Sequence, residues 1–461
     1  MEVFTLGIGE CGRNMTLKLY KIMHENRFKN LLRHCEFSVT DIGEIRRIKS
    51  FMDEMGISQT EAMEDEEKIP DKIGVAGDKG KINLIRITEH ASHAGGGVGG
   101  LWHTAASIAM EFVNKDVKGT KHAKEILKGS EYFDCINIFN SAGGGSGCGA
   151  GPVLMEYLID LSEKKGLFEG RLHTATIALP FKDEVGQWRD ANAASNIGRY
   201  SKHCDAIIIA DNEYAENLAG FGMDSRAHAA GMVNEMLAHV WMWMPLASLK
   251  TGTEQRTKDF ESTDFRRMLS RGEWAGPVVP CFARYTTQQL EDVDFRGLVE
   301  TTMRDGSMVN CNPETSRKVM VIVVFPSGYA SYVLPPGKPN PNLPEIPTRN
   351  ELRKYLIDEL FNDKKKDVSV EYLCSDAIKD EVHVIAFLTS PHIPRFLELY
   401  ETFKNYLSDK EQMIEDIYIA APSLRRMQKK KRDEVVQESI RDYENAYSLF
   451  ENYLKFLKYD I

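Results

Sequence analysis

Residues Asn140 to Pro152 read NSAGGGSGCGAGP, with six glycines and no lysine in thirteen positions. Glycine lets the backbone approach a ligand closely and adopt positive φ, so several N–H groups can face one anion. The stretch leads from an apolar strand pattern into a helical one, with Pro152 expected in the first turn. Because a helix N-terminus carries partial positive charge, a phosphate can bind here without lysine. The predicted phosphate-binding residues are Gly143, Gly144, Gly145, Ser146, Gly147 and Cys148.

Two further glycine-rich stretches each follow a strand pattern and precede a helical one. Residues 7–12, GIGECG, fit the G-x-G-x-x-G pattern of dinucleotide sites, and Asp41 is a candidate ribose partner beyond the usual spacing of about 20 residues. Residues 93–100 read HAGGGVGG. Three such loops on successive strands fit a triphosphate better than a pyrophosphate. The Walker motif G-x-x-x-x-G-K-[ST] does not occur in the sequence.

The composition is that of a soluble globular protein. Of the 461 residues, 42% are apolar and 27% are charged, which excludes a disordered or fibrous chain. The formal net charge of -10 argues against nucleic acid as a partner. The first residues lack the features of a signal peptide, and no apolar run reaches the roughly 18 residues of a membrane helix. Eight cysteines without CxxC pairs suit a reducing compartment, so we predict a cytoplasmic protein.

Short apolar segments alternate with helical patterns through the first half of the chain. The predicted strands span residues 3–8, 37–39, 82–87, 135–139, 175–179 and 206–210. Nearly unbroken apolar strands between helices predict an α/β fold, with a parallel sheet of Rossmann-like topology covered on both faces. Ligands of such sheets bind at the carboxyl ends of the strands, where the glycine-rich stretches lie. We therefore predict a nucleotide-binding domain over residues 1–224.

The rest of the chain divides into three parts. We predict a long central helix and connecting segment at 225–258, a smaller α+β domain at 259–391 and a helical C-terminal extension at 392–461. The smaller domain is expected to hold strands at 278–282, 319–325, 368–373 and 382–388, and helices at 295–305 and 349–361. The extension contains a basic run, residues 425–432, that is either a solvated helix face or a contact for a membrane or a protein adaptor.

In these motifs the chain resembles the tubulin/FtsZ superfamily of GTPases. GGGSGCGAGP is close to the family signature, GGGTGTG or GGGTGSG, with Ser146 in the threonine place. GIGECGRN, VTDIGE at 39–44 and HAGGGVGG resemble the first three nucleotide loops, in the family's order over about the first 400 residues. The resemblance is to a divergent, prokaryotic FtsZ-like or tubulin-like protein. It implies binding of GTP or GDP with Mg²⁺, which the phosphates and water hold rather than protein ligands.

The resemblance also implies a set of nucleotide contacts. Those in the first three loops are Gly9, Glu10, Cys11, Asn14, Asp41, Gly95, Gly96 and Gly97. LPFKDEVGQWRDANAA, residues 179–194, resembles the family's PF-x-x-E stretch, so Glu184 would meet the ribose and Arg189 the sugar or phosphates. Asn212, in DNEYA, and Asn234, in VNEML, match the family's guanine-reading asparagines. An amide group can both donate to and accept from the guanine edge.

The family hydrolyses GTP with acidic residues that one subunit inserts into the nucleotide pocket of the next. The matching stretch is DFESTDF, residues 259–265, where Asp264 would be the catalytic acid, Glu261 the first acid and Asp259 the residue in the asparagine place. A carboxylate there can orient the attacking water and accept its proton. A rival match, DVDFRGL at 292–298, is disfavoured because the residues after it resemble the family's next helix.

The sequence departs from the family pattern in two places. Ala230 replaces the aromatic residue that stacks on the base, and the segment between Asn234 and Asp264 is a few residues longer than usual.

The leading hypothesis is a GTP-hydrolysing cytoskeletal protein that polymerises head to tail. A GTP-binding regulator that does not polymerise is the alternative. A dinucleotide-dependent oxidoreductase is a third hypothesis, supported only by GIGECG and Asp41.

Overall fold

The computed structural model describes most of the chain. The described residues are 1–24, 34–40, 72–74, 81–85, 87, 100, 102–116, 120–164, 166, 170–182, 186–219, 225–248, 255–256, 261–292, 294–334, 346–420, 424 and 427–461. Six of the predicted site residues lie outside them, namely Asp41, Gly95, Gly96, Gly97, Glu184 and Asp259. All structural statements below concern the described residues.

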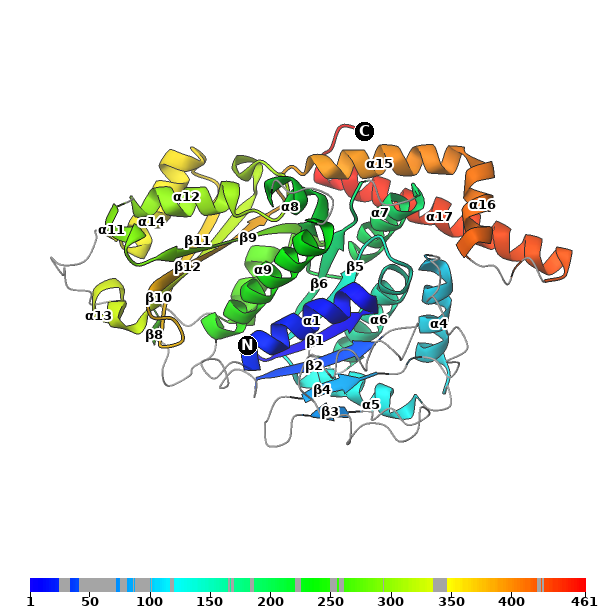
Figure 1. Cartoon of the computed structure of the whole chain (residues 1–461), viewed down its shortest axis with the longest axis horizontal. Helices are drawn as coiled ribbons and strands as arrows, with labels where there is room; N and C mark the ends of the chain where they lie inside the picture. The colour runs from blue at the N-terminus through cyan, green and yellow to red at the C-terminus, as the bar shows by residue number, and fades with distance from the viewer. Residues whose placement is uncertain are drawn as a thin grey trace.

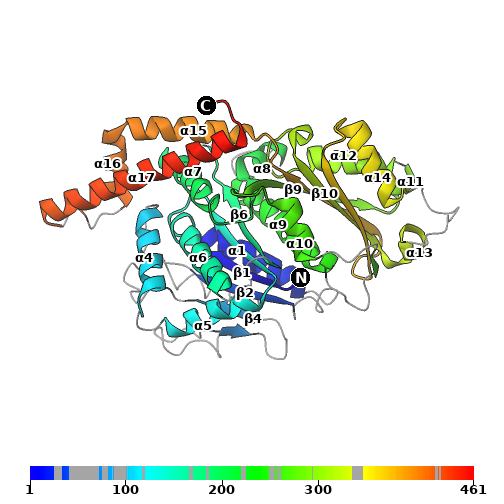
Figure 2. The same cartoon turned by 180° about the vertical axis from the view of Figure 1, so that it is seen from behind.

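The described strands form one 12-stranded sheet (Figures 1 and 2). They are β1 (Val3–Ile8), β2 (Cys35–Thr40), β3 (Lys72–Gly74), β4 (Lys81–Leu84), β5 (Cys135–Ser141), β6 (Leu172–Leu179), β7 (Ala206–Asp211), β8 (Gln255–Arg256), β9 (Gly276–Thr286), β10 (Lys318–Pro326), β11 (Asp367–Ser375) and β12 (Glu381–Thr389). Their order is β3-β4-β2-β1-β5-β6-β7-β9-β12-β10-β11-β8. The sheet is parallel from β4 to β9 and mixed beyond β9, which confirms the predicted fold class.

The parallel strands have the predicted Rossmann-like order. In chain order, β1, β2 and β4 run outward to one side, and β5, β6 and β7 run outward to the other. Val3 in β1 lies opposite Cys35 in β2 and Cys135 in β5, so β1 and β5 are the neighbours at which the order reverses. Crevices form at such a reversal, outside the carboxyl ends of the strands. The topology therefore places a ligand site beside the ends of β1 and β5.

Helices cover both faces of this parallel part. They are α1 (Gly9–His24), α4 (Trp102–Asn114), α5 (Lys121–Gly129), α6 (Gly145–Lys164), α7 (Trp188–Tyr200), α8 (Asn212–Ala219) and α9 (Ser225–Ser248). Helices α1, α8 and α9 share one hydrophobic core with one face of the sheet, and α4 to α7 share another core with the opposite face (Figures 1 and 2). All side chains of β1 and β6 are buried, as two covered faces require.

Helix α9 joins the two parts of the sheet and confirms the predicted central helix. The indole N–H of Trp241 donates to Thr176 Oγ1 in β6 at 3.0 Å, and that of Trp243 donates to His383 Nδ1 in β12 at 3.0 Å. Both indoles are buried, and a buried indole N–H is stabilised by such a partner. The apolar run in α9 is therefore core. No described helix is long and apolar enough to cross a membrane.

The second part and the C-terminal extension also have the predicted elements. The second part contains α10 (Ser262–Leu269), α11 (Gln289–Asp292), α12 (Phe295–Asp305), α13 (Ala330–Val333) and α14 (Arg349–Tyr355), the last continued by a π-helical turn at Leu356–Leu360. Short 3-10 turns occur at Ser130–Tyr132, Pro313–Thr315 and Ser327–Tyr329. The extension consists of α15 (Pro394–Ser408), α16 (Lys410–Ala420) and α17 (Lys429–Leu457). Helices α15 and α17 lie along α7 (Figure 2).

One local prediction is wrong: Pro152 does not lie in the first turn of its helix. Helix α6 begins at Gly145, so Pro152 is in the helix interior and most of the glycine-rich stretch is helical. Close packing explains these helical glycines. A Cβ on Gly149 would lie 2.0 Å from Trp102 O in α4, and one on Gly151 would lie 2.1 Å from the Tyr200 hydroxyl in α7. Only glycine allows α6 to lie this close to both neighbours.

The fold compensates for the interior proline. Proline has no N–H, so Pro152 leaves the carbonyl of Cys148, four residues earlier, without its helical partner. That carbonyl instead accepts hydrogen bonds from Asn196 Nδ2 at 3.2 Å and Arg199 Nη1 at 3.0 Å, both on α7. The guanidinium also donates to the Gly149 carbonyl at 3.3 Å. The first turns of α6 are thus held from outside the helix.

This packing predicts opposite effects for two alanine substitutions at helical glycines. Gly149→Ala should lower the free energy of unfolding by about 3 kcal/mol or more, because the new methyl group overlaps backbone. Gly231→Ala in α9 should raise it by up to about 1 kcal/mol, since no atom lies within 4 Å of the new Cβ. Urea denaturation of the two variants and the unchanged chain measures both effects. A Gly149→Ala variant as stable as Gly231→Ala would contradict this explanation.

Candidate nucleotide-binding site

Two helix N-termini meet beside the carboxyl ends of β1 and β5. Helix α1 begins at Gly9, directly after β1, and α6 begins at Gly145, shortly after β5. Gly9 has a φ of +71°, and its Cβ position lies 3.4 Å from both Gly147 N and Ser146 Cβ. Each helix N-terminus presents unpaired N–H groups and partial positive charge. Two of them at one point form a strong site for an anion.

The glycines of GIGECG bring α1 onto the sheet. A Cβ on Gly12 would lie 2.0 Å from the carbonyl oxygen of Phe139 in β5, and one on Gly7 would lie 2.5 Å from the Gly12 carbonyl oxygen. These glycines are therefore required for packing, whichever ligand binds. Among the other predicted residues of this loop, Glu10 and Asn14 are exposed and Cys11 is partly exposed. Solvent, and hence a ligand, can reach all three side chains.

Asn192 on α7 connects the third glycine-rich stretch to the signature. Its Nδ2 donates to the carbonyl of Gly100 at 2.9 Å and to the carbonyl of Gly143 at 3.3 Å. Gly100 is the last residue of HAGGGVGG, and Gly143 is the first glycine of GGGSGCGAGP. Sequence reasoning did not assign Asn192 a role. The available signal was its position in the stretch LPFKDEVGQWRDANAA, four residues before the next asparagine, Asn196.

Arg189 lies at the start of α7, beside the signature. Its guanidinium is 5.0 Å from the centre of the Trp188 ring, and its backbone oxygen is 3.4 Å from the Cβ position of Gly143. The Trp188 ring also fills the space next to Gly100 and Gly186, which have φ angles of +88° and +99°. This arrangement places the Arg189 backbone close to the signature, and the contact of Arg189 with the sugar or phosphates stays a prediction.

The two candidate guanine readers come from α8 and α9. Asn212 is the first residue of α8, directly after β7, and Asn234 lies in α9; both side chains are partly buried. Helix α9 packs against both α8 and α1, and Lys18 in α1 forms a 3.1 Å ion pair with Glu235, the neighbour of Asn234. The helices that carry the two asparagines therefore pack against each other and against the helix that begins at Gly9.

The candidate catalytic acids lie at the amino ends of the parallel strands, opposite the glycine-rich segments. Glu261 and Asp264 form a capping box at the start of α10, in which the Asp264 carboxylate accepts the Glu261 N–H at 3.2 Å. The Ser262 hydroxyl donates to the Gly170 carbonyl, just before β6, at 3.0 Å. Because β6 has eight residues, roughly 25 Å of strand separates these amino ends from the carboxyl ends. The acids and the glycine-rich segments of one chain are therefore far apart.

An ion pair fixes α10 at these amino ends. Arg266 Nε lies 2.9 Å from Asp205 Oδ1, and Asp205 Oδ2 accepts the backbone N–H of His173 at 2.9 Å. Asp205 precedes β7 and His173 is near the start of β6. Hydrogen bonds from His173 and the Arg266 guanidinium hold the pKa of Asp205 below its usual value despite its burial. The orientation of α10 is thus set by the amino ends of two sheet strands.

Burial changes the ionisation of two groups near the site. It raises the pKa of the Cys148 thiol to about 12, and that thiol donates to the Asn192 carbonyl at 3.2 Å. Cys148 therefore acts as a packing group and not as a nucleophile. Burial also raises the pKa of Asp211 to about 6, against an opposing effect of Arg395. Asp211 ends β7 and accepts the Glu213 N–H at 3.0 Å, so it caps the helix that carries Asn212.

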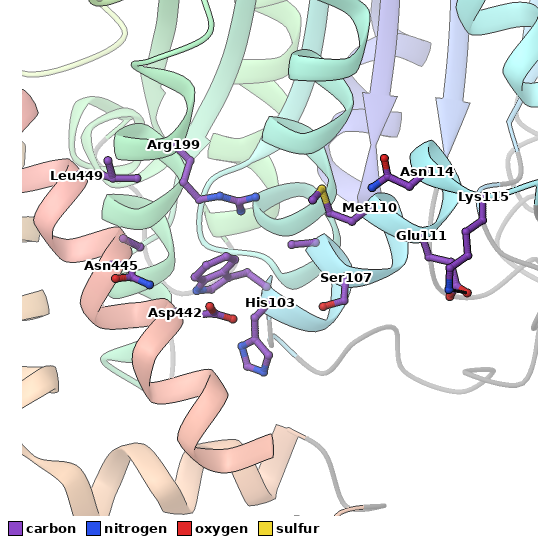
Figure 3. A pocket seen from close by; sticks show the side chains of 13 residues that line it. His103, Ser107, Met110, Glu111, Asn114, Lys115, Arg199, Asp442, Asn445 and Leu449 are labelled. Carbon is purple, nitrogen blue, oxygen red and sulfur yellow. Dashed lines mark hydrogen bonds and ion pairs between the residues drawn. The ribbon is translucent and has the colours of Figure 1, made fainter. Parts of the chain in front are cut away.

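A cavity of about 680 Å³ lies between α4 and α17 (Figure 3). Its lining includes His103 and Ser107 of α4, Arg199 of α7, and Asp442 and Asn445 of α17. None of the predicted nucleotide contacts lines it. Arg199, which lines the cavity, also donates to the Cys148 and Gly149 carbonyls in the first turns of α6. The glycine-rich segments, and not this cavity, are therefore the candidate site.

Comparison with known proteins finds a family model that matches nearly half of the chain. Residues 2–220 match the family model described as Tubulin/FtsZ family, GTPase domain. A 91-residue segment, 20% of this chain and 22% of the other, is 31% identical to cell division protein FtsZ 2 of Pyrococcus furiosus. The chain thus spans about a fifth of that relative's length.

Solved structures of similar fold cover most of the chain. CetZ1 from Haloferax volcanii, a GDP-bound monomer, has a TM-score of 0.59 and 18% identity, covering 87% of this chain and 98% of that one. CetZ2 from Haloferax volcanii, a GTPγS-bound protofilament, has a TM-score of 0.59 and 16% identity, covering 88% and 99%. At these identities the likeness shows a shared fold.

The buried Asp211 carboxyl predicts a pH-dependent effect of Asp211→Asn. Its pKa is about 6 in the fold against a usual 3.8, so ionisation of this carboxyl costs the fold about 3 kcal/mol, a penalty that is fully present above about pH 6 and absent below about pH 4. The asparagine variant, which keeps the acceptor for Glu213 N–H, should therefore be more stable by up to about 3 kcal/mol at pH 7.5. Urea denaturation from pH 4 to 8 measures this difference; a gain independent of pH would contradict the explanation.

Proposed function

We propose that this chain, whose residues 2–220 match the tubulin/FtsZ GTPase-domain model, binds GTP and hydrolyses it within filaments assembled head to tail. The observation that carries the proposal is the separation of the two halves of the candidate site. The glycine-rich segments lie at the carboxyl ends of the strands, and Glu261 and Asp264 lie at the amino ends. Stacking one copy on the next brings the acids of one against the nucleotide of the other.

The glycine-rich segments fit a triphosphate. The N-termini of α1 and α6 converge at Gly9 and Gly147, and the Cβ position of Gly144 is open, with its nearest neighbour at 3.8 Å. In the proposal, backbone N–H groups of residues 9–11 and 143–148 bind the phosphates, and Asn212 and Asn234 bind the guanine edge. Glu184, Arg189 and Asn14 complete the contacts with the sugar and phosphates, together with Asp41 and Gly95 to Gly97.

Magnesium is proposed to arrive with the nucleotide. Among the described residues, no three His, Cys, Asp or Glu side chains are grouped as metal ligands. Mg²⁺ favours phosphate oxygens and water, with few protein ligands. When bound, the ion would neutralise charge on the phosphates, and the protein's contribution would be the cradle of amides.

The acids are proposed to act on a nucleotide held by the neighbouring copy. Glu261 is exposed and Asp264 is partly exposed, so both can reach across an interface. Asp264 would orient the attacking water and accept its proton, with Glu261 and Asp259 beside it. The CetZ2 structure of similar fold is a protofilament with GTPγS, which supports assembly as the setting for this chemistry.

One observation favours a second candidate function, a GTP-binding regulator that does not polymerise. Ala230, in the place where the family stacks an aromatic ring on the base, is partly buried on α9 and offers only a methyl group. Loss of the stacking partner would weaken base binding by about 1–3 kcal/mol, which a filament protein would have to recover elsewhere. Assembly measurements distinguish the two functions.

The filament proposal predicts GTP turnover per molecule that rises above a critical protein concentration, together with light scattering. Asp264→Asn should lower turnover by about 100-fold or more without preventing assembly, because the amide keeps the acceptor that caps α10 but cannot take a proton. Asp294→Asn, at the cap of α12, is the matched control and should leave turnover within about twofold. Flat turnover with no scattering would favour the regulator.

Mixing two inactive variants tests whether the site is shared between copies. Gly144→Asp has room for its side chain and should repel phosphates, so this copy cannot bind GTP but keeps its acids. Asp264→Asn keeps the pocket but lacks the acid. Because an interface between them would pair one intact pocket with one intact acid set, their equimolar mixture should recover about a quarter of the original turnover. No recovery in co-assembled mixtures would contradict a shared site.

A further inference from the structure

The C-terminal helix α17 forms a hydrogen bond to the residue that connects two glycine-rich segments. The Tyr443 hydroxyl donates to Asn192 Oδ1 at 2.8 Å, across 251 residues of sequence. The Asn192 amide in turn donates to the carbonyls of Gly100 and Gly143 at 2.9 and 3.3 Å. Tyr443 is 1% exposed and Asn192 is fully buried, so water does not compete for the bond between these two side chains.

These bonds use both N–H donors of the Asn192 amide group and one lone pair of its oxygen. Its two N–H donors serve the two glycine carbonyls, and its oxygen accepts the tyrosine hydroxyl. A flipped amide would set its oxygen against two carbonyl oxygens, so one orientation is strongly favoured. Burial raises the pKa of Tyr443 well above its usual value, which keeps the hydroxyl protonated and able to donate.

Helix α17 also contacts α4, which starts just after Gly100. The Ser439 hydroxyl lies 2.7 Å from His103 Nε2, and the Tyr443 ring packs edge-on against Trp102 at 5.8 Å. Figure 3 shows Asp442 and Asn445 of α17 lining one cavity together with His103 of α4 and Arg199 of α7. Helix α17 thus contacts α7, whose Asn192 binds the Gly100 and Gly143 carbonyls, and α4, which begins two residues after Gly100.

We propose that Asn192 is a positioning residue for the phosphate-binding segments, and that Tyr443 of α17 fixes Asn192, so that the C-terminal helix sets nucleotide affinity. This inference rests on the proposed nucleotide site. Asn192 connects the carbonyl of Gly100, the last residue of the third stretch, to that of Gly143, the first glycine of the signature. Because coupling between two sites is reciprocal, displacement of α17 weakens nucleotide binding, and bound nucleotide strengthens the docking of α17.

The test compares two buried tyrosines on the same helix. Tyr443→Phe removes the hydroxyl bonded to Asn192, and Tyr453→Phe removes a hydroxyl that donates to the Ala275 carbonyl at 2.9 Å, outside the nucleotide site. The probe is fluorescent GDP, titrated against each full-length variant below the concentration of assembly. Tyr443→Phe should weaken affinity about tenfold, equivalent to about 1.4 kcal/mol, and Tyr453→Phe should change it less than twofold, although both lower the melting temperature.

A double-mutant cycle tests the pathway through Asn192. Asn192→Asp keeps the acceptor for Tyr443 but loses the donors to Gly100 and Gly143, so it should weaken affinity at least as much as Tyr443→Phe. The double variant should lose little more than Asn192→Asp alone, because both changes break one connection. Additive losses, or equal losses for the two tyrosine variants, would overturn the proposal and leave α17 with a purely structural role.

Hydrogen exchange without nucleotide separates failure of this inference from failure of the proposed function. Tyr443→Phe should speed amide exchange in residues 102–106 and 143–148, while Tyr453→Phe should not. If the unchanged chain binds no guanine nucleotide, the proposed function fails, and the exchange result still decides whether Tyr443 positions these segments. Unchanged exchange there in Tyr443→Phe would overturn the inference, whatever the nucleotide result.

Discussion

The close approach of α6 to its neighbours is the constraint on which the rest of this structure depends. Gly147, Gly149 and Gly151 occupy positions where a Cβ would collide with β5, α4 and α7, at distances of 2.9, 2.0 and 2.1 Å. Without these side chains the helix N-terminus reaches the end of β5 and stands beside the start of α1. The same glycines therefore serve two purposes, since they allow the packing and they leave backbone N–H groups open to an anion. A single alanine at Gly149 would disturb both.

The hydrogen bond that α6 loses at its interior proline is replaced by bonds from a neighbouring helix. Pro152 removes one helical hydrogen bond, and the freed Cys148 carbonyl is taken by Asn196 and Arg199 of α7. Helix α7 also carries Asn192, which holds Gly100 and Gly143, and Asp190, which pairs with Arg395 of α15 at 2.8 Å. Helix α7 is thus the element through which the signature, the third glycine-rich stretch and the C-terminal extension contact one another.

The sheet gives the candidate site its division into two halves. Helix α9 joins the parallel and mixed parts through Trp241 and Trp243, so the whole sheet can act as one body. At one edge lie the glycine-rich segments, and at the other α10 is anchored by Arg266 and Asp205. In the proposed function, this separation would make catalysis depend on a second copy, because Asp264 lies far from the glycine-rich segments of its own chain. Assembly and chemistry would then be linked by geometry alone.

The sequence by itself determined the elements whose signals are local. The apolar strands and the central helix at 225–248 follow from runs of apolar residues, and the candidate site follows from the positions of glycine after the strands. Only the tertiary structure decided that α6 starts at Gly145, because its early helical start depends on partners from α4 and α7. It also decided that Tyr443, Asn192 and the carbonyls of Gly100 and Gly143 meet, since contacts across 251 residues leave no trace in a local pattern. Burial, which raised the pKa of Asp211, likewise exists only once distant segments have packed together.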